Sequence, residues 1–77
     1  MEIEVKFFGR ITDKTHNSNT ILKDISNTSE LRLKLQNLYP ELTNMKYAIA
    51  VNKEIIQQDK LLKNNDIVAI LPPYAGG

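Results

Sequence analysis

The feature that most constrains the fold is a run of five apolar residues near the end of the chain, residues 67–71, which read IVAIL. Two prolines follow this run, and because proline has no N–H to donate to a sheet, they end a strand. A short run without a polar residue is typical of a strand that is buried on both faces. The run therefore predicts a central strand with a neighbouring strand on each side.

The beginning of the chain predicts a strand with a different pattern. Residues 2–8 alternate between charged and apolar side chains, which places three apolar residues on one face: Ile3, Val5 and Phe7. Phe8 breaks the alternation and adds a large aromatic side chain to the face that otherwise carries charges. This strand is therefore expected to bury one face and to expose the other.

Local patterns predict three further strands and their turns. Residues 20–25 predict a strand that follows a polar stretch. Residues 47–51 and 54–57 predict a hairpin that turns at Asn52-Lys53. Residues 64–66, Asn-Asn-Asp, predict the turn into the last strand, because asparagine tolerates left-handed dihedral angles.

One main helix is predicted between these strands. Residues 27–30 mark its start, since a small polar N-cap is followed by an acidic residue in the first turn. Pro40 is expected to end the helix near residue 38 or 39, and Leu33 lies off its apolar stripe. That stripe is formed by leucines at helical spacing: Leu31, Leu35, Leu38 and Leu42. A short helical turn is also expected near residues 11–14.

The order of these elements predicts the fold class. It runs strand, strand, helix, strand, strand, strand, which gives an α+β domain with one main helix on one face of a mixed sheet of about five strands. A length of 77 residues fits one domain and leaves little room for a second core.

Composition excludes several classes of function. The chain has no cysteine and one histidine, His16, so cysteine chemistry, clustered histidine ligands and a histidine-based triad have few residues to draw on. We expect His16 to be a surface residue. The net charge of +1 gives no basic face for nucleic acid. The alternating start is unlike a signal peptide, and no apolar run approaches the roughly 18 residues of a membrane helix. The expectation is a soluble, cytoplasmic protein that binds no metal and is not catalytic on its own.

The end of the chain combines a pair of prolines with a pair of glycines. Pro72 and Pro73 stiffen the exit from the last strand, and Gly76 and Gly77 leave the terminal carboxylate without flanking side chains. We therefore expect residues 1–73 to form the domain and residues 74–77 to form a flexible tail. The tail suits a narrow channel in which its carboxylate, once activated, carries a heteroatom. The plainer alternative is a frayed terminus, which needs neither pair.

Three segments of the chain resemble a known family. KFFG near the start, AVNKEII in the middle and DIVAILPPYAGG at the end are similar to the molybdopterin synthase small (sulfur-carrier) subunit, of the MoaD/ThiS-type ubiquitin-like β-grasp family. The resemblance covers essentially the whole chain, and its most specific element is the proline pair followed after two residues by Gly76 and Gly77. Two positions depart from the family pattern. Asn65 stands where glycine is common, and Tyr74 stands where a small aliphatic residue is expected.

The resemblance implies a mechanism in which the reacting group is the carboxylate of Gly77. A partner enzyme uses ATP to adenylate this carboxylate, and a sulfur donor protein converts it to a thiocarboxylate. The tail then enters the large subunit of molybdopterin synthase, where the sulfur passes to a cyclic pyranopterin phosphate precursor. Gly76 keeps the passage clear. The family precedent is a heterotetramer of two small and two large subunits, with no cofactor bound by the small one.

The strand patterns also suggest a partner-binding surface. If Val68 and Ile70 face the helix, then Leu71, Phe8 and one of Ile55 or Ile56 fall on the exposed face. We assign these residues to the surface that meets the large subunit, together with the residues that begin the tail: Pro72, Pro73 and Tyr74. The alternative for Phe8 is that it merely folds over the sheet edge.

Three other functions remain open at this point. The sulfur carrier of the thiamine thiazole pathway shares the Gly-Gly end and the activation chemistry, although the proline pair and the chain length favour the molybdopterin branch. A ubiquitin-like modifier joined to lysines and a plain interaction domain with an idle tail are the other two.

Overall fold

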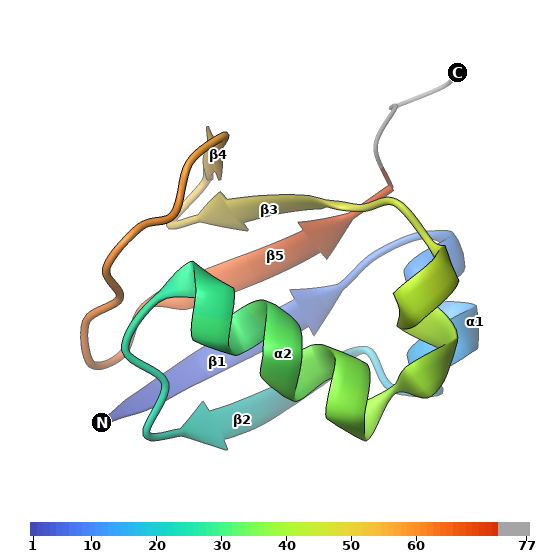
Figure 1. Cartoon of the computed structure of the whole chain (residues 1–77), viewed down its shortest axis with the longest axis horizontal. Coiled ribbons are helices and arrows are strands. Elements are labelled where there is room, and N and C mark those ends of the chain that lie inside the picture. The colour runs from blue at the N-terminus through green and yellow to red at the C-terminus, as the bar shows by residue number, and fades with distance from the viewer. Residues whose placement is uncertain (73–77) are drawn as a thin grey trace.

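The computed structural model describes residues 1–72. Its elements follow the chain in the order β1 (Glu2–Phe7), α1 (Arg10–Thr15), β2 (Asn19–Lys23), α2 (Thr28–Leu38), the 3-10 helix η1 (Pro40–Asn44), β3 (Ala48–Val51), β4 (Glu54–Ile56) and β5 (Ile67–Leu71). The predicted α+β class is confirmed, because the five strands form one sheet and α2 lies across one face of it (Figure 1). The predicted boundary between domain and tail, after Pro73, lies outside the described residues.

The strand predicted to be central does occupy the middle of the sheet. The strand order is β2-β1-β5-β3-β4, so β5 lies between β1 and β3. β5 pairs parallel with β1 and antiparallel with β3, and both remaining pairs are antiparallel hairpins. The sheet is therefore mixed, as expected, and β1 and β5 end at the same edge, where α1 begins (Figure 1).

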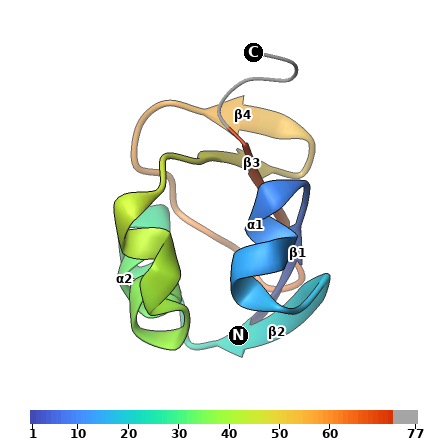
Figure 2. The same ribbon diagram turned by 90° about the vertical axis from the view of Figure 1, so that its right-hand side faces the viewer.

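The prediction that residues 67–71 are buried on both faces is wrong. Val68 and Ile70 are fully buried against the helix side, but Ile67 is 43% exposed, and Ala69 and Leu71 are half-buried. Figure 2 shows the reason: α2 covers one side of the sheet, and no helix within residues 1–72 covers the other. One helix of 11 residues is about 16 Å long and shields a single face.

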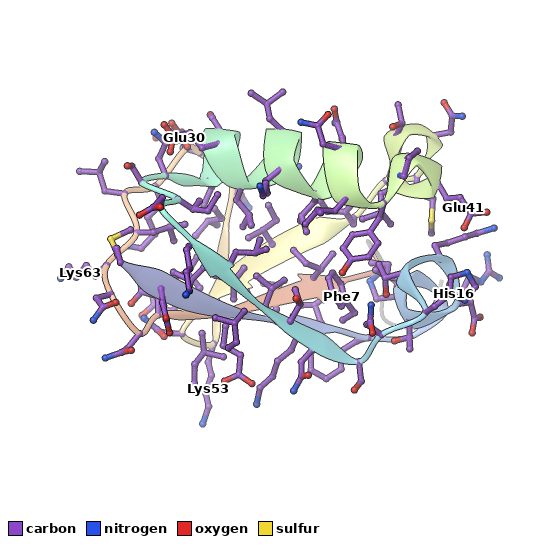
Figure 3. The ribbon with its side chains drawn as sticks, turned by 90° about the horizontal axis from the view of Figure 1, so that it is seen from below. Phe7, His16, Glu30, Glu41, Lys53 and Lys63 are labelled. Atoms are coloured by element: carbon purple, nitrogen blue, oxygen red, sulfur yellow. The ribbon has the colours of Figure 1, made fainter. Side chains whose placement is uncertain are left out.

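The core lies between the sheet and the helices, and each strand contributes alternate residues to it. Phe7 and Tyr39 meet edge to face with ring centroids 5.4 Å apart, and Phe7 lies in the layer between the sheet and α2 (Figure 3). The buried apolar residues of this core are Ile3, Val5, Phe7, Ile11, Leu22, Ile25, Leu31, Leu35, Leu42, Ile49, Val51, Leu62, Val68 and Ile70. The predicted inward face of β1 is therefore confirmed.

The start of α2 is capped as its sequence predicts. The Oδ1 atom of Asn27 accepts a hydrogen bond from the N–H of Glu30 at 2.8 Å. The Oε1 atom of Glu30 accepts one in return from the N–H of Ser26 at 2.8 Å. These bonds satisfy backbone donors that a helix leaves free at its start.

A carboxylate from a distant segment reaches the same helix end. The Oδ1 atom of Asp59 accepts hydrogen bonds from the hydroxyl of Thr28 at 2.6 Å and from the N–H of Ser29 at 2.8 Å. The Thr28 hydroxyl, and after it the Ser29 N–H, hold the pKa of Asp59 below its ordinary value. The segment before β5 is thereby fastened to α2 at an end where the helix dipole favours a negative charge.

The predicted leucine stripe is only partly correct. Leu31 and Leu35 are fully buried, but Leu38 is 46% exposed and is the last residue of α2. Leu42 is buried, but it belongs to η1 and not to the same helix. Pro40 is the physical reason, because the chain must leave the α-helix before it and re-enters as a 3-10 turn.

The second strand is shorter than predicted, whereas the helical turn before it is confirmed as α1. β2 ends at Lys23 because Asp24 takes a left-handed φ of 61°. Ile25, predicted to lie in this strand, is beyond it and packs in the core. The hairpin turn is confirmed: Asn52 and Lys53 have φ values of 50° and 75°, the two positive angles that a type I′ turn needs.

Asn52 and Asp66 join this hairpin turn to the start of β5. The Nδ2 of Asn52 donates to Oδ1 of Asp66 at 2.9 Å, and the N–H of Lys63 donates to Oδ2 at 2.8 Å. The Oδ1 of Asn52 accepts from the N–H of Ile67 at 3.0 Å. The Lys63 N–H, followed by the Asn52 amide, lowers the pKa of the buried Asp66 carboxyl.

We predict that Asp66→Asn destabilises the protein at neutral pH by about 1–2 kcal/mol, because the new amide turns a donor toward the N–H of Lys63. The depressed pKa of Asp66 makes its contribution complete above the ordinary value of 3.8 and lost as the pH falls through the lower folded value. Urea unfolding at pH 7 and at a series of decreasing pH values below 3.8 measures this difference. Asp13→Asn, at an exposed position of α1, is the control. An Asp66→Asn penalty that persists at the lowest pH would contradict the assignment.

Candidate functional site

The side of the sheet that α2 leaves uncovered is the candidate site, and we call it the open face. Strand register places its members in adjacent rows: Glu4 lies beside Ile21 and Ile67, and Ala50 beside Ala69 and Ile55. The open face consists of the strand residues that point away from α2: Glu2, Glu4, Lys6, Asn19, Ile21, Lys23, Ala48, Ala50, Ile55, Ile67, Ala69 and Leu71. Most of them are apolar, although they face away from the core.

Phe8 extends this surface at the edge where β1 and β5 end. It follows Phe7, which is paired with Ile70, and its N–H donates to the carbonyl of Ile70 at 3.1 Å. Continuing the register by one residue places Phe8 beside Leu71. The Phe8 side chain is 44% exposed. The predicted juxtaposition of Phe8 and Leu71 on the uncovered side of the sheet is therefore present.

The structure also decides between the two isoleucines of β4. Ile55 is paired with Ala50 on the open face and is 64% exposed. Ile56 is paired with Ile49 and packs against the core, on the side of α2. Ile55, and not Ile56, thus lies with Phe8 and Leu71 on the open face, and a role of Ile56 in binding would require contact at the strand edge. The binding roles themselves stay predictions.

Two large, exposed apolar residues of the open face, Ile21 and Ile67, were not among the predicted site residues. Ile67 was hidden because a uniformly apolar run gives no alternation to show which residues point outward. Ile21 lies in the short strand β2, and it joins the surface only because β2 pairs with β1 in a register that sets Ile21 beside Glu4. Knowledge of which strands pair, and in which register, would have identified both residues, but a single sequence does not contain this information in a readable form.

Charged groups occupy part of the open face and its border. Glu4 and Lys6 lie within it, and Lys53 projects from the hairpin turn on the side of the sheet opposite α2 (Figure 3). Carboxylate and ammonium groups set between apolar residues give a partner both a hydrophobic area and fixed charges for orientation.

Pro72 follows the central strand of the same sheet, directly after the end of β5. Pro72 is half-buried. The other predicted tail residues, Pro73, Tyr74, Gly76 and Gly77, lie outside the described residues. Their assigned roles stay predictions.

The described part of the chain offers little catalytic equipment. His16 is exposed and ends α1 with a left-handed φ of 60°, as a surface residue. Among residues 1–72 no group of three or more histidine, cysteine, aspartate or glutamate side chains could hold a metal ion. Within the same residues, no helix has the length and apolar character needed to cross a membrane. The open face is suited to binding another protein.

The fold defines the class of protein. In the ubiquitin-like β-grasp, the first and last strands of the chain pair in parallel within a mixed sheet of five strands, and one main helix lies across one face of that sheet. This chain has that arrangement. Putative molybdopterin converting factor subunit 1 of Pyrococcus furiosus has this fold with a TM-score of 0.88 and 19% identity, over 95% of this chain and 98% of its own. The ThiS family matches residues 5–77, and the chain belongs to this family.

Relatives of higher identity carry more specific names. The molybdopterin synthase sulfur carrier subunit of Dictyostelium discoideum is 38% identical over 58 residues, which cover 70% of this chain and 67% of that protein. A chain from the complex of subunits 1 and 2 of molybdopterin-converting factor of Helicobacter pylori is 34% identical, with both chains covered completely and a TM-score of 0.76. Small archaeal modifier protein 1 of Methanosarcina acetivorans shares the fold at a TM-score of 0.85 and 24% identity, over 99% of this chain and 96% of its own.

We predict that Ile55→Asp changes the unfolding free energy by no more than about 0.5 kcal/mol, since the side chain is exposed. Ile56→Asp, one position along the same strand, is expected to cost about 2 kcal/mol or more because its carboxylate enters the core side. Urea unfolding of the two variants measures the difference. Equal costs would contradict the assignment of Ile55 to the open face.

Proposed function

We propose that this chain is the sulfur carrier of a molybdopterin synthase. The observation that carries the proposal is that the chain combines a largely apolar open face with a Gly-Gly motif, which follows the central strand of the same sheet in the sequence. The 38% identical relative is named as such a carrier. The 34% identical chain comes from a complex of two subunits of molybdopterin-converting factor. Both support a large-subunit partner for this chain.

The chemistry of the proposal takes place at the carboxylate of Gly77. A carboxylate oxygen attacks the α-phosphate of ATP within an adenylating enzyme, and pyrophosphate leaves. A sulfur nucleophile at the oxidation level of sulfide, supplied by a donor protein, then attacks the acyl carbon of Gly77; the bond to AMP breaks, AMP leaves, and the product is a thiocarboxylate. The large subunit transfers this sulfur to the pyranopterin precursor. General acids, bases and substrate contacts come from the partners, which fits the sparse catalytic equipment of residues 1–72.

The open face supplies the docking surface in this proposal. Phe8, Leu71 and Ile55 expose apolar area around the exit of β5, and Glu4 and Lys6 orient the partner. A protein docked there covers the edge of the sheet from which Pro72 leaves, so the residues that follow are held close to it. Binding and delivery of the carboxylate thereby use one surface.

A carrier for thiamine thiazole synthesis is the second candidate, and the match of the ThiS family over residues 5–77 is compatible with it as well as with the first. The two candidates share adenylation and the thiocarboxylate, and they differ in the acceptor of the sulfur. The two relatives above 30% identity favour the molybdopterin branch.

We predict that incubation with an adenylating enzyme, ATP and a sulfur source replaces one terminal oxygen of Gly77 by sulfur, which intact-mass spectrometry detects. A chain lacking Gly76 and Gly77 is the control and is expected to stay unmodified. An unmodified full chain, in the presence of an enzyme shown to be competent on another carrier, would refute the proposal. An isopeptide bond from Gly77 to a lysine of another protein would indicate a modifier instead.

We predict that Phe8→Asp weakens binding to the large subunit by tenfold or more, about 1.4 kcal/mol at least, because it places a charge in an apolar contact. Leu33→Asp is the matched control: Leu33 is 63% exposed on α2, away from the open face. Isothermal titration calorimetry with the large subunit measures both variants. Unchanged affinity for Phe8→Asp would remove this residue from the interface, and an equal loss for Leu33→Asp would move the interface to the helix side.

A further inference from the structure

The ring of Pro72, the residue that follows β5, lies where a side chain at position 9 would be. A Cβ atom added at Gly9 would lie 2.9 Å from Cγ of Pro72 and 3.5 Å from its Cδ. The first distance is shorter than any ordinary carbon–carbon contact. The ring of Pro72 therefore rests in the space that every other amino acid at position 9 would fill with a side chain.

The backbone of Gly9 excludes other residues independently. Its φ of 58° and ψ of −136° are the mirror image of the polyproline conformation. An L-residue with a side chain meets steric strain in this region, whereas glycine adopts it freely. Position 9 thus needs glycine both for its own dihedral angles and for the neighbouring proline ring.

Gly9 is also held in place from both sides. The N–H of Phe8 donates to the carbonyl of Ile70 at 3.1 Å, which ties the end of β1 to β5. The carbonyl of Gly9 accepts from the N–H of Thr12 at 3.1 Å, which ties Gly9 to the start of α1. The Thr12 hydroxyl in turn donates to the carbonyl of Phe7 at 3.1 Å. Gly9 is a fixed surface against which the ring of Pro72 lies.

Pro72 is the residue at which the chain leaves the sheet. Its own φ is set by the ring, and β5 fixes the residue before it. The contact with Gly9 fixes the position of the ring itself. The position of Pro72 is therefore set by three elements: β5, the proline ring and the bare Cα of Gly9.

We propose that Gly9 is a positioning residue, which aims the tail by seating the ring of Pro72. The proposal rests on the proposed function, in which the end of the tail must reach a reacting group in a partner. A change at Gly9 alters the aim of the tail and leaves the open face intact. The kinetic signature is then a lower kcat with little change in KM, because docking persists while the reacting end is displaced.

The test uses chains made by total chemical synthesis, which permits D-alanine at position 9. In Gly9→Ala the new methyl group points at Pro72, and the backbone is strained. D-alanine favours the positive φ and places its methyl group in the position of the other hydrogen. We expect Gly9→Ala to lower kcat for thiocarboxylate formation on the order of tenfold, with KM changed less than about twofold. The D-alanine chain is expected to recover most of the loss.

A second variant covers the case in which Gly9→Ala fails to fold. Pro72→Ala removes the ring and leaves the dihedral angles of Gly9 unstrained, and it is expected to lower kcat in the same direction. The seating itself is measured without any partner, by a nuclear Overhauser effect between the α protons of Gly9 and the γ protons of Pro72 in the wild-type chain.

The outcomes separate this inference from the proposed function. If the wild-type chain forms no thiocarboxylate with a competent enzyme, the proposed function fails, and the inference that rests on it fails too. If the wild-type chain is modified but Gly9→Ala, or Pro72→Ala where the former does not fold, reacts equally fast, only the inference is overturned. Absence of the nuclear Overhauser effect, or a D-alanine chain as slow as Gly9→Ala, overturns it as well.

Discussion

The parallel pairing of β1 with β5 is the constraint on which the rest of the structure depends. It joins the first strand of the chain to the last, with Glu4 beside Ile67 and Phe7 beside Ile70. A parallel pair requires a long crossover connection. Here that connection contains α1, β2, α2, η1, β3 and β4. Because parallel strands end on the same side of a sheet, the pairing brings Phe8, Gly9 and Pro72 together just beyond the ends of β1 and β5.

A second constraint is the small amount of helix that is available to cover the sheet. Within residues 1–72, one main helix covers one face of the sheet, and no helix covers the other. A small domain buries only about 60% of the surface that its unfolded chain exposes, so apolar residues left on the open face are a cost to solubility unless a partner covers them. The uncovered isoleucines Ile21, Ile55 and Ile67 fit a protein whose work is done against another protein's surface.

Local chemistry explains which parts of the fold could be predicted. The caps of α2, the asparagine turn at Asn52-Lys53 and the alternation of β1 depend on residues close in sequence, and all three are confirmed. One prediction failed because a distant element decided the outcome, and another failed at a local break in the helix. Residues 67–71 were expected to be buried on both faces, and they are not, because burial depends on what lies over a strand and not on the strand's own composition. The stripe ending in Leu38 and Leu42 failed because Pro40 redirects the chain between them.

Residue patterns along the chain were enough to predict the fold class, the central place of the last strand and the family resemblance, since these follow from periodicity, turn residues and motifs. The folded structure was needed to show which of Ile55 and Ile56 faces outward, that Ile21 and Ile67 join Phe8 and Leu71 on one surface, and that the ring of Pro72 lies beside Gly9. The physical reason is strand register. A shift of one residue turns every side chain to the opposite face, and register is fixed by pairing between segments as far apart as residues 4 and 67, which no local pattern encodes.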